Sequence, residues 1–333
     1  MKKNFARHGL GLIFSGLAAC LALLSGSVYA QAWPARNLTI IVPLAAGTGM
    51  DIIARLYGER LAASLGKPVI IENKPGAGFI VPTQAALAAP ADGHTLLVGA
   101  PANLSYNHIL YKQVAYDPEK DLVPISHYLT SPFFLVVNPG LPVNSVSEFI
   151  QYAKVRSPPL SYSSPAGGGV PAFAVEAMAQ RFDLKFTHVP YRNSPQSIVD
   201  IASGHVDFAF AEAGASQALI RDGKLRALAV SSRQRVPAHA SIPPLAEVAG
   251  VPDFEVVAGH MLVARAGTPL PILERLSAEM KRIMGAPEMQ QRMANMGLIP
   301  LVPAPLAETD RYIKSEVVKW RTLLTALGVA GSQ

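Results

Sequence analysis

Short apolar runs typical of buried strands alternate with amphipathic segments along most of this chain. Residues 38–42 read Leu-Thr-Ile-Ile-Val, and the segment 51–65 repeats apolar residues at helical spacing. Continuous β-branched runs indicate buried parallel strands, whereas apolar residues at every third or fourth position indicate a helix that packs on one face. The alternation continues with strands expected over 69–71 and 95–99 and a helix over 81–89. This βαβαβ order predicts half of a doubly wound α/β sheet.

A second α/β unit is expected from residue 133 onward. Its first helix begins with Ser145-Val-Ser-Glu148, a capping box in which side chains bind free N–H groups at the helix start. With 333 residues the chain is long enough for two domains. The remaining strands are expected over 133–137, 160–163, 186–189, 206–211, 225–231 and 259–265, and the remaining helices over 145–155, 170–182, 194–203, 214–221, 271–284, 287–296 and 306–327.

The first 30 residues have the order of a secretory signal peptide. Basic residues precede an apolar stretch over 10–24, and the small residues Val28 and Ala30 flank Tyr29 at its end. Such a leader directs export and is removed, so the sequence predicts a periplasmic protein whose mature chain begins at Gln31. A lipid anchor through Cys20 is the alternative, because Leu-Ala-Ala-Cys resembles a lipobox. The residues after Cys20 stay apolar where a lipoprotein normally turns polar, which favours simple cleavage.

Charge and cysteine content exclude several classes of function. Three of the 29 basic residues lie in the leader and none of the 23 acids does, so the mature net charge is 26 − 23 = +3. No long basic run remains, and nucleic acid is therefore not an expected partner. The single cysteine, Cys20, also lies in the leader. A mature chain without cysteine has no disulfide, no thiol nucleophile and no Cys-ligated metal.

Three glycine-containing loops are the candidate binding elements. Gly47-Thr-Gly49, Gly76-Ala-Gly78 and Gly167-Gly-Gly169 each follow an expected strand and precede an expected helix. Backbone N–H groups at such helix starts favour an anion. Any one loop could be a tight turn without a ligand, but three at the carboxyl ends of strands in two sheets predict a shared cleft. Dinucleotide, Walker, metalloprotease and nucleophile-elbow motifs are missing, so no cofactor, metal or catalytic set is expected.

Two charged residues near these loops have two interpretations each. Asp51 begins a helix, where an exposed acid in the first turn would interact with the helix dipole; a place in the pocket wall is the alternative. Arg192, after Tyr191, would either offer a cation to a bound acid or be an ordinary exposed loop arginine.

Ordered motifs along the whole mature chain resemble the Bug family, the substrate-binding proteins of tripartite tricarboxylate transporters. The resemblance rests on the segments 33–43 (W-P-A-R-N-L-T-I-I-V-P), 49–51 (G-x-D), 69–78 (V-I-I-E-N-K-P-G-A-G), 91–99 (A-D-G-H-T-L-L-V-G), 110–111 (L-Y), 116–118 (Y-D-P) with Asp121, 188–191 (H-V-P-Y), 204–207 (G-H-V-D), 223–230 (G-K-L-R-A-L-A-V) and 264–269 (A-R-A-G-T-P).

The resemblance implies a type II periplasmic-binding-protein fold, with two doubly wound α/β domains joined by two crossing strands around a ligand cleft. Domain 1 would comprise 31–134 and 258–333, and domain 2 would comprise 135–257. It implies a monomeric, non-enzymatic receptor that closes by a hinge on a small organic acid, such as a di- or tricarboxylate, an acidic amino acid or an aromatic acid. Its partner would be the membrane subunits of a tripartite tricarboxylate-type transporter or, alternatively, a sensor protein. An exported enzyme acting on a small acid is the rival class, and it lacks a visible nucleophile–base pair.

By motif position, the resemblance also implies which residues bind the ligand. Departures from the family pattern leave the identity of the acid open: the first loop adds the Thr48 hydroxyl, Arg192 and Asn193 replace the usual Lys-Gly, and Ala211-Glu212 replace an acid and a small polar residue. The implied ligand-binding residues are Ala46, Gly47, Thr48, Ser163, Ser164, Gly167, Gly168, Gly169, Tyr191, Arg192, Ala211 and Glu212.

Overall fold

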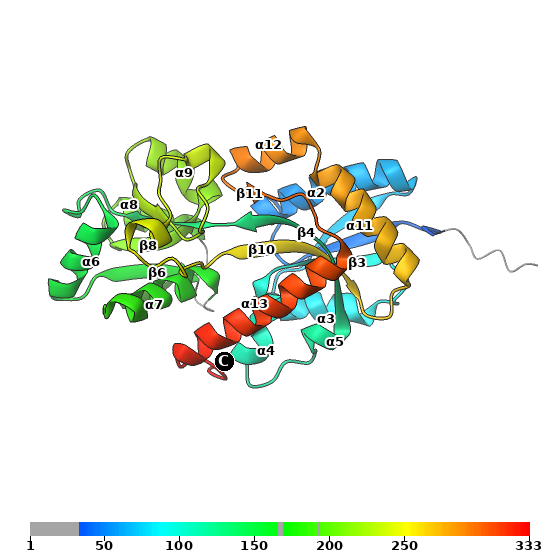
Figure 1. Cartoon of the computed structure of the whole chain (residues 1–333), viewed down its shortest axis with the longest axis horizontal. Helices are drawn as coiled ribbons and strands as arrows, with labels where there is room; N and C mark the ends of the chain where they lie inside the picture. The colour runs from blue at the N-terminus through cyan, green and yellow to red at the C-terminus, as the bar shows by residue number, and fades with distance from the viewer. Residues whose placement is uncertain (1–32, 166–168, 192–193) are drawn as a thin grey trace, which may run out of the picture. The chain divides into compact units, whose positions relative to one another are not determined.

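The computed structural model describes residues 33–165, 169–191 and 194–333 (Figure 1). Contacts divide the chain into two units, Met1–Ala35 and Arg36–Gln333, and the second contains both sheets. The predicted signal peptide, with Cys20 and the predicted cleavage site before Gln31, lies outside the described residues. Within those residues, every helix is too short or too polar to cross a lipid bilayer.

The first of two sheets has six strands, and its central strands are the apolar runs seen in the sequence. β1 pairs in parallel with β2 and β3, while β10 runs antiparallel to β3 and β4 antiparallel to β10. Apolar residues of β1 and β3 are almost fully buried, as expected for strands covered on both faces. In sheet order the strands are β11 (Ile299–Pro300), β4 (Leu122–Ser131), β10 (Ala258–Arg265), β3 (Thr95–Gly99), β1 (Leu38–Val42) and β2 (Val69–Asn73).

The second sheet has five strands and a different core on each face. Along β8, Phe208 and Phe210 belong to one apolar cluster, whereas Ala209 and Ala211 belong to the other. This alternation follows from the two-residue period of a strand. In sheet order the strands are β7 (Thr187–Tyr191), β6 (Ser161–Pro165), β8 (Phe208–Glu212), β5 (Phe133–Val137) and β9 (Arg226–Val230).

Helices cover the faces of both sheets. In the first, α2 and α11 pack together, with α2 against β1 and β2 and α11 against β4, while α3 packs on β3 and α13 on β4. In the second, α7 packs on β6 and β8, and α8 and α9 contact each other and β8. The helices are α2 (Gly49–Leu65), α3 (Ile80–Ala88), α4 (Asn107–Leu110), α5 (Pro118–Asp121), α6 (Val146–Val155), α7 (Val170–Phe182), α8 (Ser194–Ala202), α9 (Ala213–Arg221), α10 (Leu245–Val248), α11 (Leu270–Met284), α12 (Pro287–Asn295) and α13 (Leu306–Ala326), with short turns η1 (Ala77–Phe79), η2 (Ala102–Tyr106) and η3 (Pro237–His239).

Two long strands connect the sheets. β4 has ten residues and is separated from β5 of the second sheet by Pro132 alone, and it lies beside β10 (Figure 1). The pairing of β4 with β10 is irregular at two places, between His260 and Met261 and between Leu262 and Val263. Irregular pairing of this kind bends a strand locally. We refer to β4 and β10 as the crossing strands.

Most expected elements are confirmed, but two strands, β4 and β11, and the short helices α4, α5 and α10 were not expected. β1, β3 and β5 have the predicted bounds, and Ser145 accepts a hydrogen bond from the Glu148 amide (3.2 Å), as the capping box requires. The prediction of a loop from residue 164 was wrong, because β6 continues to Pro165. β4 was not expected at all, since Pro124 and the polar residues around it break the apolar pattern.

Candidate functional site

The loop before α2 is held by Asp51, which is only 2% exposed. Its carboxylate accepts hydrogen bonds from the Gly47 amide (2.9 Å) and the Asn73 side chain (3.0 Å), and it forms an ion pair with Arg55 (2.9 Å). Burial by itself raises the pKa of Asp51, but these partners outweigh it and leave the pKa below its usual value. Asp51 is therefore a buried organiser of the loop, and the interpretation as an exposed acid of the first turn was wrong.

Thr48 caps the same helix. Its hydroxyl donates to the Ala45 carbonyl (2.8 Å) and accepts from the Asp51 amide (3.4 Å). Ala46 and Gly47 are exposed, and Gly47 has a positive φ of 84°. Because the Thr48 hydroxyl is engaged by the backbone, and Ala45, Ala46 and Gly47 have no polar side chain, the loop can offer a ligand polar contacts only through main-chain atoms.

Ser163 and Ser164 are both buried, and they lie on opposite faces of the second sheet. The Ser164 hydroxyl lies 2.7 Å from Nε2 of His188 on the neighbouring strand. The Ser163 hydroxyl has no hydrogen-bond partner within the described residues. A buried hydroxyl without a hydrogen-bond partner destabilises the fold. Of the two serines, Ser163 is therefore the one whose hydroxyl can still donate to a ligand.

Gly169 immediately precedes α7 and faces a residue of the first lobe. We use the term first lobe for the six-stranded sheet with its helices. It has a φ of +120°, and a Cβ built on it would lie 4.0 Å from the Tyr106 hydroxyl. Tyr106 comes from η2 and packs edge-on against Phe173 of α7. Gly167, Gly168 and Arg192, which the sequence also suggests as ligand residues, lie outside the described residues.

Tyr191 is turned toward α8. Its hydroxyl donates to the Asp200 carboxylate (2.5 Å), and burial together with this carboxylate raises the pKa of Tyr191 to about 12. The hydroxyl is thus engaged within the second lobe, which is the five-stranded sheet with its helices. No sequence pattern pairs these two residues, because Asp200 lies on the following helix.

At the end of β8, the buried Ala211 is followed by the exposed Glu212. The next residue, Ala213, touches the first lobe: a Cβ built on Gly297 would lie 2.3 Å from the Ala213 Cβ. Gly297 also has a positive φ of 76°, so its conformation and its close approach both require glycine.

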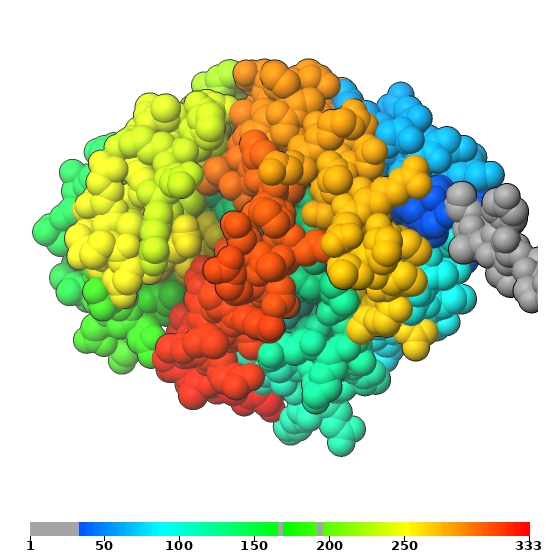
Figure 2. Space-filling model, turned by 45° about the vertical axis from the view of Figure 1, so that its right-hand side comes forward, coloured from blue at the N-terminus to red at the C-terminus, as the bar shows by residue number. Residues whose placement is uncertain are grey.

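Two contacts between the lobes lie beside predicted segments. Met296 lies against Gly49 at the start of α2, with its Cε 3.9 Å from a Cβ built there, and the adjacent Gly297 touches Ala213. The start of α2 and the end of β8 therefore both lie next to residues 296–297. The space-filling view shows orange α12 against yellow-green parts of the second lobe (Figure 2). Gly169 and Tyr106 form the other contact. Sequence reasoning missed Tyr106, Met296 and Gly297, since nothing in a single sequence marks a contact between lobes.

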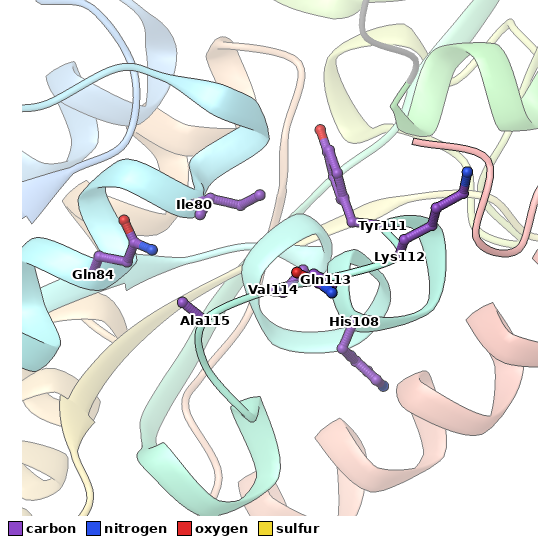
Figure 3. Close-up of a pocket in the computed structure, with 8 residues that line it drawn as sticks. All are labelled: Ile80, Gln84, His108, Tyr111, Lys112, Gln113, Val114 and Ala115. Carbon is purple, nitrogen blue, oxygen red and sulfur yellow. The ribbon is translucent and has the colours of Figure 1, made fainter.

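A separate pocket of about 710 Å³ lies between α3 and the chain after α4 (Figure 3). It contains none of the predicted site residues. Figure 3 shows that Tyr111, Lys112 and His108 point in different directions, rather than toward one centre. The residues that line it are Ile80, Gln84, His108, Tyr111, Lys112, Gln113, Val114 and Ala115.

Known proteins of one family match most of the chain. The family described as tripartite tricarboxylate transporter family receptor matches residues 53–329. A UPF0065 protein from the tcbD-tcbE intergenic region of Pseudomonas sp. strain P51 is 31% identical, covering 99% of this chain and 98% of its own, and protein BugT of Bordetella pertussis is 30% identical, covering 94% and 96%.

Solved structures agree with these relatives. Rpa4515 of R. palustris with adipate has a TM-score of 0.79 at 29% identity, covering 90% of this chain and 99% of its own. MatC of Rhodopseudomonas palustris with bound malate has a TM-score of 0.75 at 28% identity, covering 88% and 100%. The periplasmic binding protein BugD has a TM-score of 0.77 at 27% identity, covering 90% and 99%. The two-lobed fold is thus that of the periplasmic binding proteins.

Proposed function

This chain belongs to the tripartite tricarboxylate transporter receptor family, and we propose that it captures a small carboxylate in the periplasm and delivers it to the membrane subunits of such a transporter. The family consists of substrate receptors, so the chain is a receptor and not an enzyme. The same proposal includes export with cleavage before Gln31. It also includes a division into domain 1 (31–134 and 258–333) and domain 2 (135–257).

One observation carries the choice of an acid as ligand. Two loops that each start a helix, one ending at Thr48 and one at Gly169, lie beside contacts between the lobes. Main-chain N–H groups at helix starts bind anions, and glycine lets a ligand approach the backbone closely. Rpa4515 and MatC, which share the fold at 29% and 28% identity, hold adipate and malate. We therefore propose that both loops hold the ligand carboxylate mainly through backbone amides.

The proposed ligand residues come from both lobes, and closure of the lobes would bring them around the acid. In Ser164 and Tyr191 the hydroxyl already has a partner, so we assign the contact of these two residues to the main chain. Both the hydroxyl and the amide of Thr48 donate to the Ala45 carbonyl, so the place of Thr48 in the set rests on its motif position. The proposed set within the described residues is Ala46, Gly47, Thr48, Ser163, Ser164, Gly169, Tyr191, Ala211 and Glu212.

A thermal-shift screen of small acids tests the proposal. A ligand that binds only the folded state at a hundredfold excess over its dissociation constant adds about 2.7 kcal/mol of stability, which raises the melting temperature. We expect carboxylates to give the hits and the corresponding amides to give none. If neutral sugars or amines raised the melting temperature and acids did not, the proposal would be wrong.

Calorimetry on a substituted chain locates the site. Gly169→Val should weaken binding of the best acid at least about tenfold, because a branched side chain strains the positive φ and fills the approach to the loop. Gly223→Ala is the control, since Gly223 also has a positive φ (68°) but has open space around it. Equal losses in both variants would place the ligand elsewhere.

Delivery to a membrane transporter has its own test. A strain that lacks this receptor should take up the radiolabelled acid more slowly, and the full chain should restore uptake. Normal uptake in the deletion strain, with binding intact in the purified protein, would contradict the transporter partner and leave the receptor function standing.

A further inference from the structure

Helix α13 contributes to the apolar cores of both lobes. In its first half, Ile313 and Val317 pack in a cluster with residues of β1, β3 and β10. Further along, Trp320 and Leu324 pack in the cluster that contains residues of β5, β8 and α7 from the second lobe. These four residues are three or four positions apart, so they lie on one face of the helix. α13 therefore extends from the first lobe to the second (Figure 1).

Three aromatic rings meet where α13 reaches the second lobe. Trp320 of α13 and Tyr106 of η2, with ring centres 5.2 Å apart, come from the first lobe. Phe173 of α7 comes from the second lobe, and its ring centre lies 5.9 Å from that of Trp320 and 5.4 Å from that of Tyr106. All three side chains are buried, and rings at these separations attract one another. Phe173 thus contacts two rings of the first lobe at once.

A hydrogen bond joins the same two helices further along. The side-chain amide of Gln180, on α7, donates to the carbonyl of Ala326, the last residue of α13 (2.9 Å). Gln180 comes seven residues after Phe173, and Ala326 comes six residues after Trp320. At a rise of about 1.5 Å per residue, α7 and α13 therefore lie side by side over about 10 Å.

A buried carboxylate fixes the orientation of Trp320. Nε1 of Trp320 donates to Glu316 (3.1 Å), which also accepts a hydrogen bond from Lys319 (3.1 Å). The Lys319 ammonium lies 3.7 Å from the carboxylate of Glu255, in the segment that leads from the second lobe into β10. The helix is therefore attached to the second lobe on the polar side of Trp320 as well as on its aromatic side.

The contacts of α13 with Phe173, Gln180 and Glu255 are all made between residues of the chain itself. A contact that forms only when the lobes are together shifts the population toward that arrangement, whether or not a ligand is bound. We propose that α13 is a strap that holds the lobes together at rest, and that Phe173 must leave Trp320 and Tyr106 before the lobes can separate. The strap also strengthens binding of an acid between the lobes, a consequence that rests on the proposed function.

Distances between labels on the two lobes test the strap without any acid. The chain from Gln31 onward has no cysteine, so Glu59→Cys on α2 and Lys154→Cys on α6 provide two unique, exposed sites for spin labels. Electron paramagnetic resonance gives the distribution of distances between the labels. We expect one distance to dominate in the otherwise unchanged chain, and Phe173→Leu to increase the population of a second distance at least about threefold.

Two further variants separate the strap from a general loss of stability. Phe149→Leu makes the same change in a buried ring whose partners, Phe186 and Phe208, belong to the second lobe, and it should leave the distances unchanged. Gln180→Glu changes an exposed residue outside the core and places a negative charge beside the carbonyl end of α13, which repels it. This variant should increase the population of the second distance while the melting temperature stays near that of the unchanged chain.

The outcomes keep the strap and the proposed function apart. If folded Phe173→Leu and Gln180→Glu show the distances of the unchanged chain, or if Phe149→Leu acts like Phe173→Leu, the strap is wrong. For an acid found by the thermal-shift screen, Phe173→Leu should raise the dissociation constant at least about threefold, because binding must then also bring the lobes together. If the distances change as expected but no acid binds, the strap stands and the proposed function fails.

Discussion

At the scale of single residues, Asp51 links three parts of the first lobe. It holds the Gly47 amide at the tip of the first loop, the side chain of Asn73 at the end of β2 and Arg55 one turn along α2. Asn73 in turn donates to the Leu44 carbonyl (2.9 Å), so the loop is attached at both sides. The shape of a candidate ligand wall therefore depends on one buried carboxylate.

Asp51→Ala should destabilise the fold by about 1–3 kcal/mol at pH 7, because it leaves buried donors without their acceptor. The folded-state pKa of Asp51 is lowered, so its contribution is complete above the unfolded value of about 3.9 and is lost as pH falls through the folded value. Urea unfolding at pH 7 and pH 3 measures this difference. Asp310→Ala, which removes an exposed ion pair with Lys314 (2.7 Å), should cost at most about 0.5 kcal/mol.

Part of the site was predictable from single residues. Glycine at positions 47 and 169 has a physical reason that a sequence reveals, since loops between strand and helix require positive φ there. The engagement of the Tyr191 hydroxyl by Asp200 was not predictable, because it depends on how α8 packs on β7.

At the scale of elements, the crossing strands contain two histidines in a poorly hydrated region. His127 of β4 stacks on Tyr312 of α13, with ring centres 4.5 Å apart, and its Nε2 lies 3.1 Å from the Leu129 carbonyl. Nδ1 of His260, on β10, is buried and without a partner in the described structure. Burial lowers the pKa of each imidazole to about 4, and for His260 the neighbouring His127 adds to the effect.

The stability of the fold should fall as pH decreases from about 6.5 to about 4. The unfolded histidines have a pKa near 6.5, so in this range the unfolded chain binds protons that the folded chain does not. Each pH unit by which folding lowers a histidine pKa corresponds to about 1.4 kcal/mol of unfolding free energy, and partial solvent access of both rings reduces that figure. In the double variant that combines His127→Gln with His260→Gln, the urea midpoint should change less over this pH range than it does in the wild type. The exposed His205→Gln is the control, and an unchanged slope in the double variant would contradict the expectation.

The same strands show why sequence patterns predicted most elements but not all of them. β1 and β5 are continuous apolar runs, which buried strands favour. β4 contains Pro124, Ser126 and His127, which break that pattern. Pro124 is tolerated because it lies opposite Val263, at one of the irregular places in the pairing with β10. Pro124 and the polar residues beside it therefore hide β4 from the sequence pattern.

At the scale of the whole molecule, the approach of the two lobes is limited by two of the smallest residues. Gly297 and Ala213 meet with no room for a Cβ on Gly297, and Gly169 faces Tyr106 across the other contact. Interfaces packed this closely have discrete arrangements and do not deform continuously. The size of residue 297 should therefore influence how fully the receptor can close.

Gly297→Ala should raise the dissociation constant of the best acid about tenfold or more without removing any group that contacts the ligand. The added methyl group would overlap Ala213, so the lobes would have to stay further apart or the turn would have to distort. Gly328→Ala has a similar backbone strain, with a φ of 70° and open space around it, and serves as the control. Calorimetry gives the affinity and X-ray scattering gives the size of the liganded protein; equal effects of both variants would exclude the steric explanation.

The contact between Ala213 and Gly297 also offers a position at which a label can report the approach of the two lobes. Gly214, the next residue, is exposed and has open space around it. The only cysteine in the chain is Cys20, so after removal of the leader Gly214→Cys would create a unique thiol. An environment-sensitive dye on that thiol would report in real time when the first lobe arrives and departs. The chain could then serve as an optical sensor for its own ligand.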